Sequence, residues 1–343
     1  MTNNLLVREQ YLLDDHPLTL LGASFIHPSG KAPSIVLQCE LNGIALSAWE
    51  INTLRIFLGD VYPAACDLYL LLLRYLKRIV ITSPDNDTSV EIAADCLKPV
   101  GFAADESILT KDKGYIQGHL ILQEYFLFPD KFLFMDLTGL DKCKKLGNSS
   151  RFEINFELAD CPLVAPKITE KSFAFSVTPV INLLEHKARP ISFISDLGDQ
   201  AVRPEGEPAD HFQIYSVDRV EGLAKNRSAK IIYDMQNTTL QPKGSSRTCQ
   251  ISQRKSTLKD GFDTFISIPH HTDESDTPRI KLGIDLTCTN GTLPEQLGIG
   301  DVCFSTRSTP EFVEPRNIKT ISSAVFQDRQ QNRQWRLLCW PSS

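Results

Sequence analysis

The sequence predicts an α+β fold, with mostly antiparallel groups of strands and a few buried helices arranged in two lobes. The chain has 343 residues, of which 42% are hydrophobic and 23% charged, an ordinary balance for a globular protein of about two domains. Several segments alternate apolar and polar residues at the period of a strand, and two segments have the length and wide apolar face of a helix. Both kinds of element are therefore expected along the same chain.

The first segment, to about residue 60, is predicted to be rich in strands. Apolar residues alternate with polar ones along a half-buried strand: Ile35, Leu37, Cys39 and Leu41. Asn42-Gly43 is a hairpin turn signal, and residues 51–58 form a second strand candidate. A helix is then predicted from about Ala64 to Lys77, capped by Asp60, with Pro63 in its first turn and a leucine-rich middle buried on most sides. A short hairpin is expected next, with strands at 79–82 and 90–93.

The centre of the chain is the stretch 114–140, GYIQGHLILQEYFLFPDKFLFMDLTGL. Residues 115–128 predict a helix whose polar residues gather on a narrow arc, so that most of its surface is buried. Pro129 removes a backbone donor and ends this helix. Residues 131–137 predict a strand that is apolar on both faces and lies inside a sheet. The aromatic stripe of this stretch is assigned to the core: Tyr125, Phe126, Phe128, Phe132 and Phe134.

A polar loop at 141–150 separates this stretch from a strand at 151–158, and a loose lobe boundary is placed here. The predicted lobes are residues 1–145 and 146–343. Strands are expected at 213–220 and 281–288, and loops at 196–210 and 241–260.

The composition excludes several classes of function. A net charge of −6 argues against a nucleic-acid-binding protein, and the basic residues of 243–259 are interpreted as a solvated loop. Nine cysteines are spread singly without a CxxC pair, which indicates reduced, buried thiols. The N-terminus lacks the pattern of a secretory signal. The apolar run Leu68–Leu73 is far shorter than the roughly 20 residues that span a bilayer, so no direct membrane insertion is expected.

The search for catalytic sets finds weak candidates. His270-His271, with Asp273, Glu274 and Asp276 nearby, is the best metal-like cluster, and Asp14-Asp15-His16 is weaker. Adjacent histidines on a polar loop usually bind nothing, and His119, among apolar residues of the central helix, is expected to be a satisfied core residue. No nucleophile elbow, zincin motif or phosphate-binding loop occurs. No catalytic residue, metal ligand or cofactor is therefore predicted.

The central stretch resembles the signature of the TssF family (also called VasA or ImpG), a baseplate subunit of the bacterial type VI secretion system. Further segments, at 97–106, 176–191, 215–220, 286–294 and 335–338, are similar to other segments of the family. Ser176, Val177 and Arg189 depart from its pattern. The resemblance assigns a scaffold role to these signature residues: Pro99, Gly101, Phe102, Gln123, Glu124, Tyr125, Phe126, Pro129, Lys131, Phe132, Asp136, Gly139, Pro179, Asn182, Tyr215, Asp218, Asn290 and Gly291.

The resemblance covers nearly the whole chain, but only the middle portion of the longer family members, with both flanks missing. It implies a structural scaffold of the baseplate wedge that supports assembly of the sheath and tube. The partners it implies are TssG, a second TssF copy, TssK and TssE, with the protein cytoplasmic and docked at the inner membrane through them. The alternatives are a contractile phage-type tail baseplate protein, or a metal-dependent hydrolase that uses the His270-His271 loop.

Overall fold

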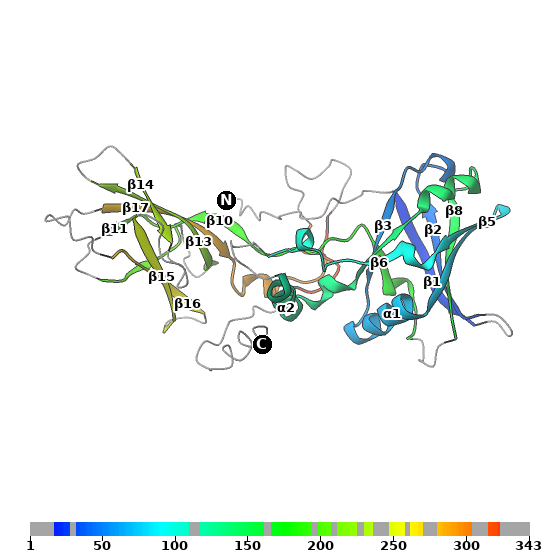
Figure 1. Ribbon diagram of the computed structural model, residues 1–343, viewed down its shortest axis with the longest axis horizontal. Helices are drawn as coiled ribbons and strands as arrows, with labels where there is room; N and C mark the ends of the chain where they lie inside the picture. The colour runs from blue at the N-terminus through cyan, green and yellow to red at the C-terminus, as the bar shows by residue number, and fades with distance from the viewer. Residues whose placement is uncertain are drawn as a thin grey trace. The chain divides into compact units, whose positions relative to one another are not determined.

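The structure is a computed structural model and describes residues 17–27, 32–109, 117–160, 166–193, 198–206, 211–224, 230–235, 247–257, 261–269, 280–303 and 315–322. The chain separates into two compact units between Val180 and Ile181, the N-terminal unit and the C-terminal unit. The N-terminal unit contains a five-stranded and a four-stranded sheet, and the C-terminal unit an eight-stranded sheet (Figure 1). These mostly antiparallel sheets, together with two α-helices among the described residues, confirm the α+β prediction.

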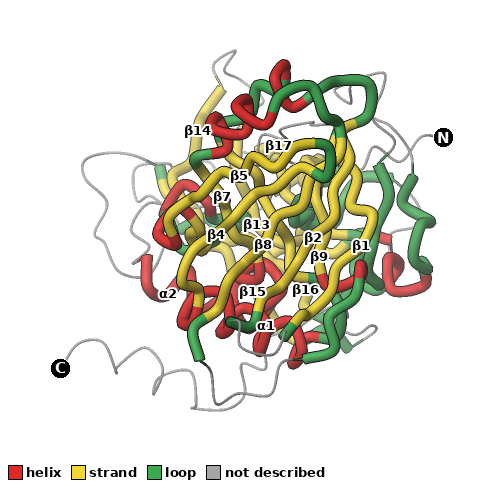
Figure 2. The backbone as a smooth tube through the Cα atoms, turned by 90° about the vertical axis from the view of Figure 1, so that its right-hand side faces the viewer, coloured by secondary structure: helices red, strands yellow, loops and turns green. Residues whose placement is uncertain are grey.

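The five-stranded sheet of the N-terminal unit is antiparallel throughout. Its strands follow one another in the order β1 (Leu18–Ile26), β2 (Ser34–Leu41), β8 (Arg151–Leu158), β4 (Leu76–Ser83) and β5 (Asn86–Ala93). Figure 2 shows β1, β2, β8 and β4 running side by side. The alternation read from the sequence is confirmed, since every second residue of β2 and of β8 is buried.

The four-stranded sheet is also antiparallel. Its order is β6 (Leu97–Pro99), β7 (Phe134–Thr138), β3 (Thr53–Leu58) and β9 (Phe173–Phe175). β7 lies inside the sheet, as its two apolar faces predict. The hairpin predicted at Asn42-Gly43 is wrong, because β2 and β3 belong to different sheets and the chain crosses between them through η1 (Leu46–Ala48).

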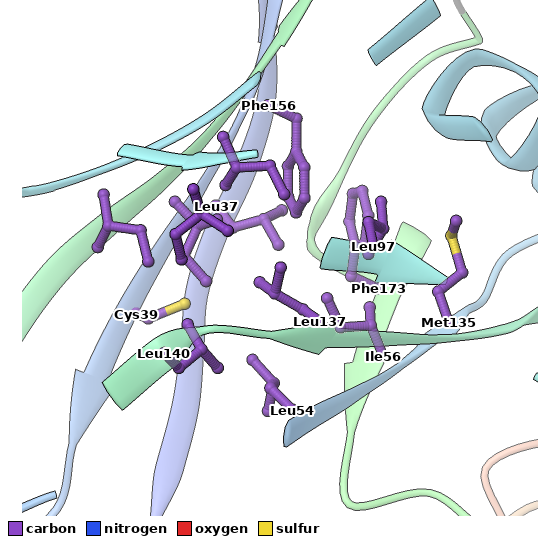
Figure 3. Packing of buried hydrophobic residues seen from close by; sticks show 14 of the residues in the cluster. Leu37, Cys39, Leu54, Ile56, Leu97, Met135, Leu137, Leu140, Phe156 and Phe173 are labelled. Atoms are coloured by element: carbon purple, nitrogen blue, oxygen red, sulfur yellow. The ribbon is translucent and has the colours of Figure 1, made fainter. Parts of the chain in front are cut away.

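One apolar core joins the two sheets. Figure 3 shows Leu37 and Cys39 of β2 on one side of this core and Ile56 and Leu137 of β3 and β7 on the other. These four side chains are at most 2% exposed. Burying one such side chain contributes on the order of 1.5–3 kcal/mol, so the paired sheets form the frame that carries the rest of the unit.

Helix α1 (Tyr62–Tyr75) contacts β3, β4 and β8. Leu68, Leu71 and Leu72 are buried, but Leu70 and Leu73 are exposed, which corrects the prediction of burial on most sides. The cap is also corrected: the helix begins after Val61, and Asp60 accepts a hydrogen bond from the Val61 N–H instead. Within the described ranges, no helix has the length and the apolar run needed to cross a membrane.

The predicted polar loop at 141–150 contains the 3-10 helix η5 (Leu140–Leu146), whose Leu140, Cys143 and Leu146 are buried. Other short 3-10 helices are η2 (Ala94–Cys96), η3 (Ala104–Glu106), η4 (Pro129–Leu133), η6 (Glu170–Ser172) and η9 (Leu293–Gln296). The lobe boundary predicted after residue 145 falls inside the N-terminal unit, because β8 pairs with both β2 and β4.

The eight-stranded sheet of the C-terminal unit runs in the order β10 (Leu184–Lys187), β17 (Ile280–Thr289), β13 (Gln213–Ala224), β14 (Lys230–Met235), β15 (Thr248–Lys255), β16 (Phe262–Ser267) and β12 (Gln200–Val202), and β11 (Ile191–Phe193) also pairs with β17. Only β14 and β15 pair in parallel among these strands. The strands predicted at 213–220 and 281–288 are confirmed as parts of β13 and β17.

Two predicted loops of this unit contain strands. β12 lies within 196–210, and β15 lies within 241–260. The second prediction was wrong because most residues of β15 are polar, although its first residues are buried: Thr248 and Cys249 are buried, and Ile251 pairs with Ile266. Arg254, on the same strand, forms an ion pair with Asp199 and lies 4.6 Å from the ring centre of Phe265.

Replacing Leu137 with Ala tests the core between the two sheets. Leu137 is 0% exposed, so Leu137→Ala should lower the free energy of unfolding by about 2–5 kcal/mol. Leu122→Ala is the matched control, since Leu122 is 43% exposed and its loss should have little effect. Urea unfolding followed by circular dichroism measures both, and equal losses would contradict the packing described.

Candidate functional site

The signature stretch folds into α2 (Gln117–Leu127), then η4, then β7. The helix ends two residues before Pro129, close to its predicted end, while Tyr115 lies outside the described residues. The strand begins at Phe134, later than predicted, because Lys131 is still in a turn and its N–H donates to the Phe128 carbonyl at 3.2 Å. A short turn therefore stands between helix and strand, and it fixes where Lys131 points.

Helix α2 is not mostly buried, which corrects the sequence prediction. Among its residues only Leu120 and Glu124 are buried, and these lie four apart on one face. Leu122 is 43% exposed, Tyr125 45% and Phe126 69%. The helix turns its carboxylate and Leu120 inward, and it turns Leu122, Tyr125 and Phe126 outward.

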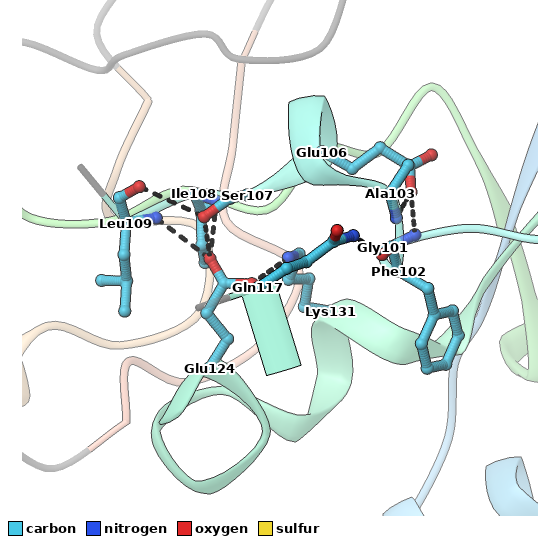
Figure 4. A network of polar contacts seen from close by, with 10 residues as sticks. All are labelled: Gly101, Phe102, Ala103, Glu106, Ser107, Ile108, Leu109, Gln117, Glu124 and Lys131. Atoms are coloured by element: carbon cyan, nitrogen blue, oxygen red, sulfur yellow. Dashed lines mark hydrogen bonds and ion pairs between the residues drawn. The ribbon is translucent and has the colours of Figure 1, made fainter. Parts of the chain in front are cut away.

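A buried ion pair explains this orientation. Lys131 Nζ donates to Glu124 Oε2, and each side chain is 1% exposed. Glu124 Oε1 accepts hydrogen bonds from Ser107 Oγ at 2.7 Å, Ile108 N at 2.8 Å and Leu109 N at 3.1 Å (Figure 4). A charge withdrawn from water is tolerated only with such partners. The signal in the sequence was the one carboxylate of the helix, with a lysine seven residues later.

The loop before α2 is held by a second carboxylate. Glu106 Oε2 accepts hydrogen bonds from Gly101 N at 2.8 Å and from Ala103 N at 2.9 Å. Gly101 has a φ of +103°, and a Cβ there would lie 3.0 Å from the Lys131 carbonyl oxygen, so the position requires glycine. Gln117 Nε2 donates to the Phe102 carbonyl at 3.2 Å. The loop is thus attached both to α2 and to η4.

Aromatic rings meet where the loop, α2 and η4 come together. Phe132 is buried, with its ring centre 5.0 Å from that of Phe102 and 5.9 Å from that of Tyr125. Tyr125 in turn lies 5.8 Å from Phe126. Figure 4 shows Phe102 pointing away from the polar network, and its side chain is 44% exposed. We call the exposed members of this group, together with the exposed Leu122 one turn before Phe126 on α2, the aromatic surface: Phe102, Leu122, Tyr125 and Phe126.

The core assignment of the aromatic stripe is therefore only partly correct. Phe132 and Phe134 are buried and Phe128 is half-buried, whereas Tyr125 and Phe126 are exposed. Helix α1 extends the aromatic surface, since the Tyr62 side chain lies beside that of Tyr125. Burial and the neighbouring Tyr125 side chain raise the pKa of the Tyr62 hydroxyl. Val61, beside Tyr62, is 67% exposed.

The other signature residues of the N-terminal unit have structural positions. Asp136 receives a bidentate pair from Arg55, at 2.8 Å from Nε and 2.7 Å from Nη2, which ties β7 to β3. Gly139, with a φ of +81°, precedes η5. Four signature residues of this unit remain. Pro99 ends β6 and Pro129 begins η4, whereas Gln123 is half-buried and Pro179 is buried.

In the C-terminal unit the signature residues lie at strands and turns. Asp218 accepts hydrogen bonds from Ser216 Oγ and Thr287 Oγ1, both at 2.7 Å, which links β13 to β17. Asn290 Nδ2 donates to the His211 carbonyl at 3.3 Å, and the Gly291 N–H donates to Thr289 Oγ1 at 3.2 Å. Tyr215 is 38% exposed, and Asn182 is half-buried.

Among the described residues, no group of three or more His, Cys, Asp or Glu side chains could hold a metal ion. His270-His271 and Asp14-Asp15-His16 lie outside those residues. His119 is not the satisfied core residue that was predicted: it is half-buried, and its Nε2 atom has no hydrogen-bond partner in the described part of the chain.

The described cysteines are free thiols, and four of them are buried: Cys39, Cys143, Cys249 and Cys288. Burial raises the pKa of the Cys39 and Cys143 thiols to about 12 and that of Cys249 to about 11. Because the thiolate is the reactive form, these raised pKa values lower the reactivity of the three thiols in the folded protein. Cys303 is exposed.

Comparison with known proteins points to one family. The model of the family described as "Type VI secretion system, TssF" matches residues 9–339. The type VI secretion system component TssF1 of Pseudomonas aeruginosa is 23% identical over 305 residues, covering 83% of this chain and 49% of the relative. The fold is similar to a chain in a cryo-electron microscopy structure of the type VI secretion system TssK-TssF-TssG baseplate subcomplex. That match has a TM-score of 0.74 and 20% identity, and covers 95% of this chain and 60% of the other. The chain thus spans about half the length of its curated relative.

The buried ion pair can be tested by removing its cation. Lys131→Met should lower the free energy of unfolding by about 3–5 kcal/mol, because Glu124 would stay buried without its counter-charge. Arg78→Met is the matched control at the exposed pair of Arg78 with Glu157, where a much smaller loss is expected. Urea unfolding measures both variants, and a loss at Lys131 no larger than the control would show that the pair is not buried as described.

Thiol labelling tests the burial of the cysteines. Among the described cysteines of the native protein, Cys303 should react first with a maleimide, and Cys39, Cys143, Cys249 and Cys288 should react only after denaturation. Peptide mass spectrometry identifies each labelled site, and Cys303→Ser serves as the control that removes the labelling at that position. Early labelling of Cys39 would contradict the closed core between the two sheets.

Proposed function

The chain belongs to the TssF family of the type VI secretion system, and on that basis we propose that it is a structural component of the baseplate wedge, supporting assembly of the sheath and tube. The observation that carries the proposal is the family match over residues 9–339. The fold similarity to a chain of the TssK-TssF-TssG subcomplex supports it. Its role would be to hold neighbouring proteins in place through large interfaces.

The partners proposed for this chain are TssG and TssK, the two other proteins named in the related baseplate subcomplex. By family resemblance we also propose contacts with a second TssF copy and with TssE. The chain would work in the cytoplasm and reach the inner membrane only through these partners. We assign it no catalytic residue, since a scaffold contributes contact surface rather than reacting groups.

The chemistry of the signature stretch is consistent with such a role. Its one buried carboxylate, Glu124, is fully engaged by Lys131 and by three hydrogen-bond donors. A buried carboxylate with all these partners fixes the orientation of the helix and has no free oxygen that a substrate could reach. What the stretch presents to solvent is apolar surface on α2, which suits contact with another protein.

Co-purification tests the proposed function. The full chain, co-expressed with tagged TssG and TssK from the same organism, should elute with them in size-exclusion chromatography. A full-length TssF relative with its own TssG and TssK is the positive control. If the relative forms the complex and this chain does not, the chain is not a working baseplate subunit.

A further inference from the structure

We propose that the aromatic surface binds another protein chain of the assembly through an apolar face flanked by lysine and arginine residues. This inference rests on the proposed function, because it names the chemistry of one contact that the scaffold would make.

The aromatic surface and its extension on α1 are strongly exposed to solvent. Phe126 is 69% exposed, and Val61 is 67% exposed. A single exposed apolar residue is ordinary, but adjacent large ones are typical of contact sites. Leu122 and Phe126 lie one turn apart on α2. The ring of Tyr125 lies near those of both Phe126 and Phe132. Aromatic side chains are enriched at the centres of protein interfaces.

The aromatic surface is also rigidly supported. The pair of Glu124 and Lys131 joins α2 to η4 beneath it, and the hydrogen bonds of Glu106 fix the loop that carries Phe102. The buried ring of Phe132 supports Phe102 and Tyr125. Side chains fixed before binding lose little conformational entropy on binding, so each contact contributes more of its energy to affinity.

The segments that form the aromatic surface and its extension carry only negative charges. These segments are 60–66, 101–106 and 117–130. Across these described residues the charged side chains are all carboxylates, without a lysine or arginine: Asp60, Asp105, Glu106, Glu124 and Asp130. Glu124 is neutralised by Lys131 inside the unit, whereas Asp60 and Asp105 are exposed. The exposed charges of these three described segments are therefore negative, and they complement a positively charged partner.

The same charges argue against other occupants. A second copy bound through a two-fold axis would bring the identical negative charges together, which costs free energy. Nucleic acid and anionic lipid would be repelled for the same reason. A protein face with an apolar centre and basic flanks meets both the aromatic side chains and the carboxylates.

The test compares variants of the full chain in binding to the co-purified TssG–TssK complex, measured by biolayer interferometry at two salt concentrations. Phe126→Ser should weaken binding by about tenfold or more. Asp105→Lys should weaken it several-fold and reduce its salt dependence. Ile232→Ser, at an apolar residue of β14 that is 58% exposed in the other unit, is the control and should bind like wild type. Circular dichroism checks that each variant is folded.

The outcomes separate the two proposals. Wild-type binding with unchanged binding of folded Phe126→Ser would overturn the inference and leave the proposed function intact. Failure of the wild type to bind, while a full-length relative binds its own partners, would overturn both. Phe126→Ser that changes the mass of the chain alone in light scattering would identify a second copy as the occupant, and would also overturn the inference.

Discussion

The pair of Glu124 and Lys131 determines the architecture of the signature stretch. Two opposite charges lie in the interior, and the carboxylate also accepts three hydrogen bonds from residues 107–109. Such an arrangement is stable only when every partner is in place, since a buried charge without compensation is very costly. The pair therefore fixes the rotation of α2, the path of the loop before it and the turn after it, all at once.

This polar attachment differs from the way the rest of the N-terminal unit is held. The two sheets pack through one apolar core, and α1 adds buried leucines to this core. Apolar packing has no preferred direction and favours burying as much surface as possible. Helix α2 is instead oriented by one buried carboxylate, and Leu122, Tyr125 and Phe126 are left at the surface. The exposed aromatics are thus a consequence of the buried pair.

The signature residues divide accordingly into two roles. Gly101, Glu124, Lys131 and Asp136 shape the backbone and join elements, whereas Phe102, Tyr125 and Phe126 face outward. In this stretch the specific residues set the geometry of the backbone and of the exposed side chains. In a protein proposed to hold neighbours, the rigid support and the contact surface come from the same short stretch.

The sequence by itself determined the fold class and about half of the described strands, because burial of one strand face leaves an alternation of apolar and polar residues along the chain, as in β2 and β8. It also carried the family, through a stretch of unusual aromatic residues. Only the tertiary structure decided which face of α2 is buried, that β8 belongs with the first unit and that β15 is a strand. Those features depend on partners distant in the chain. Periodicity shows that a helix has two faces, but the position of Lys131, set by a turn after Pro129, decides which face turns inward.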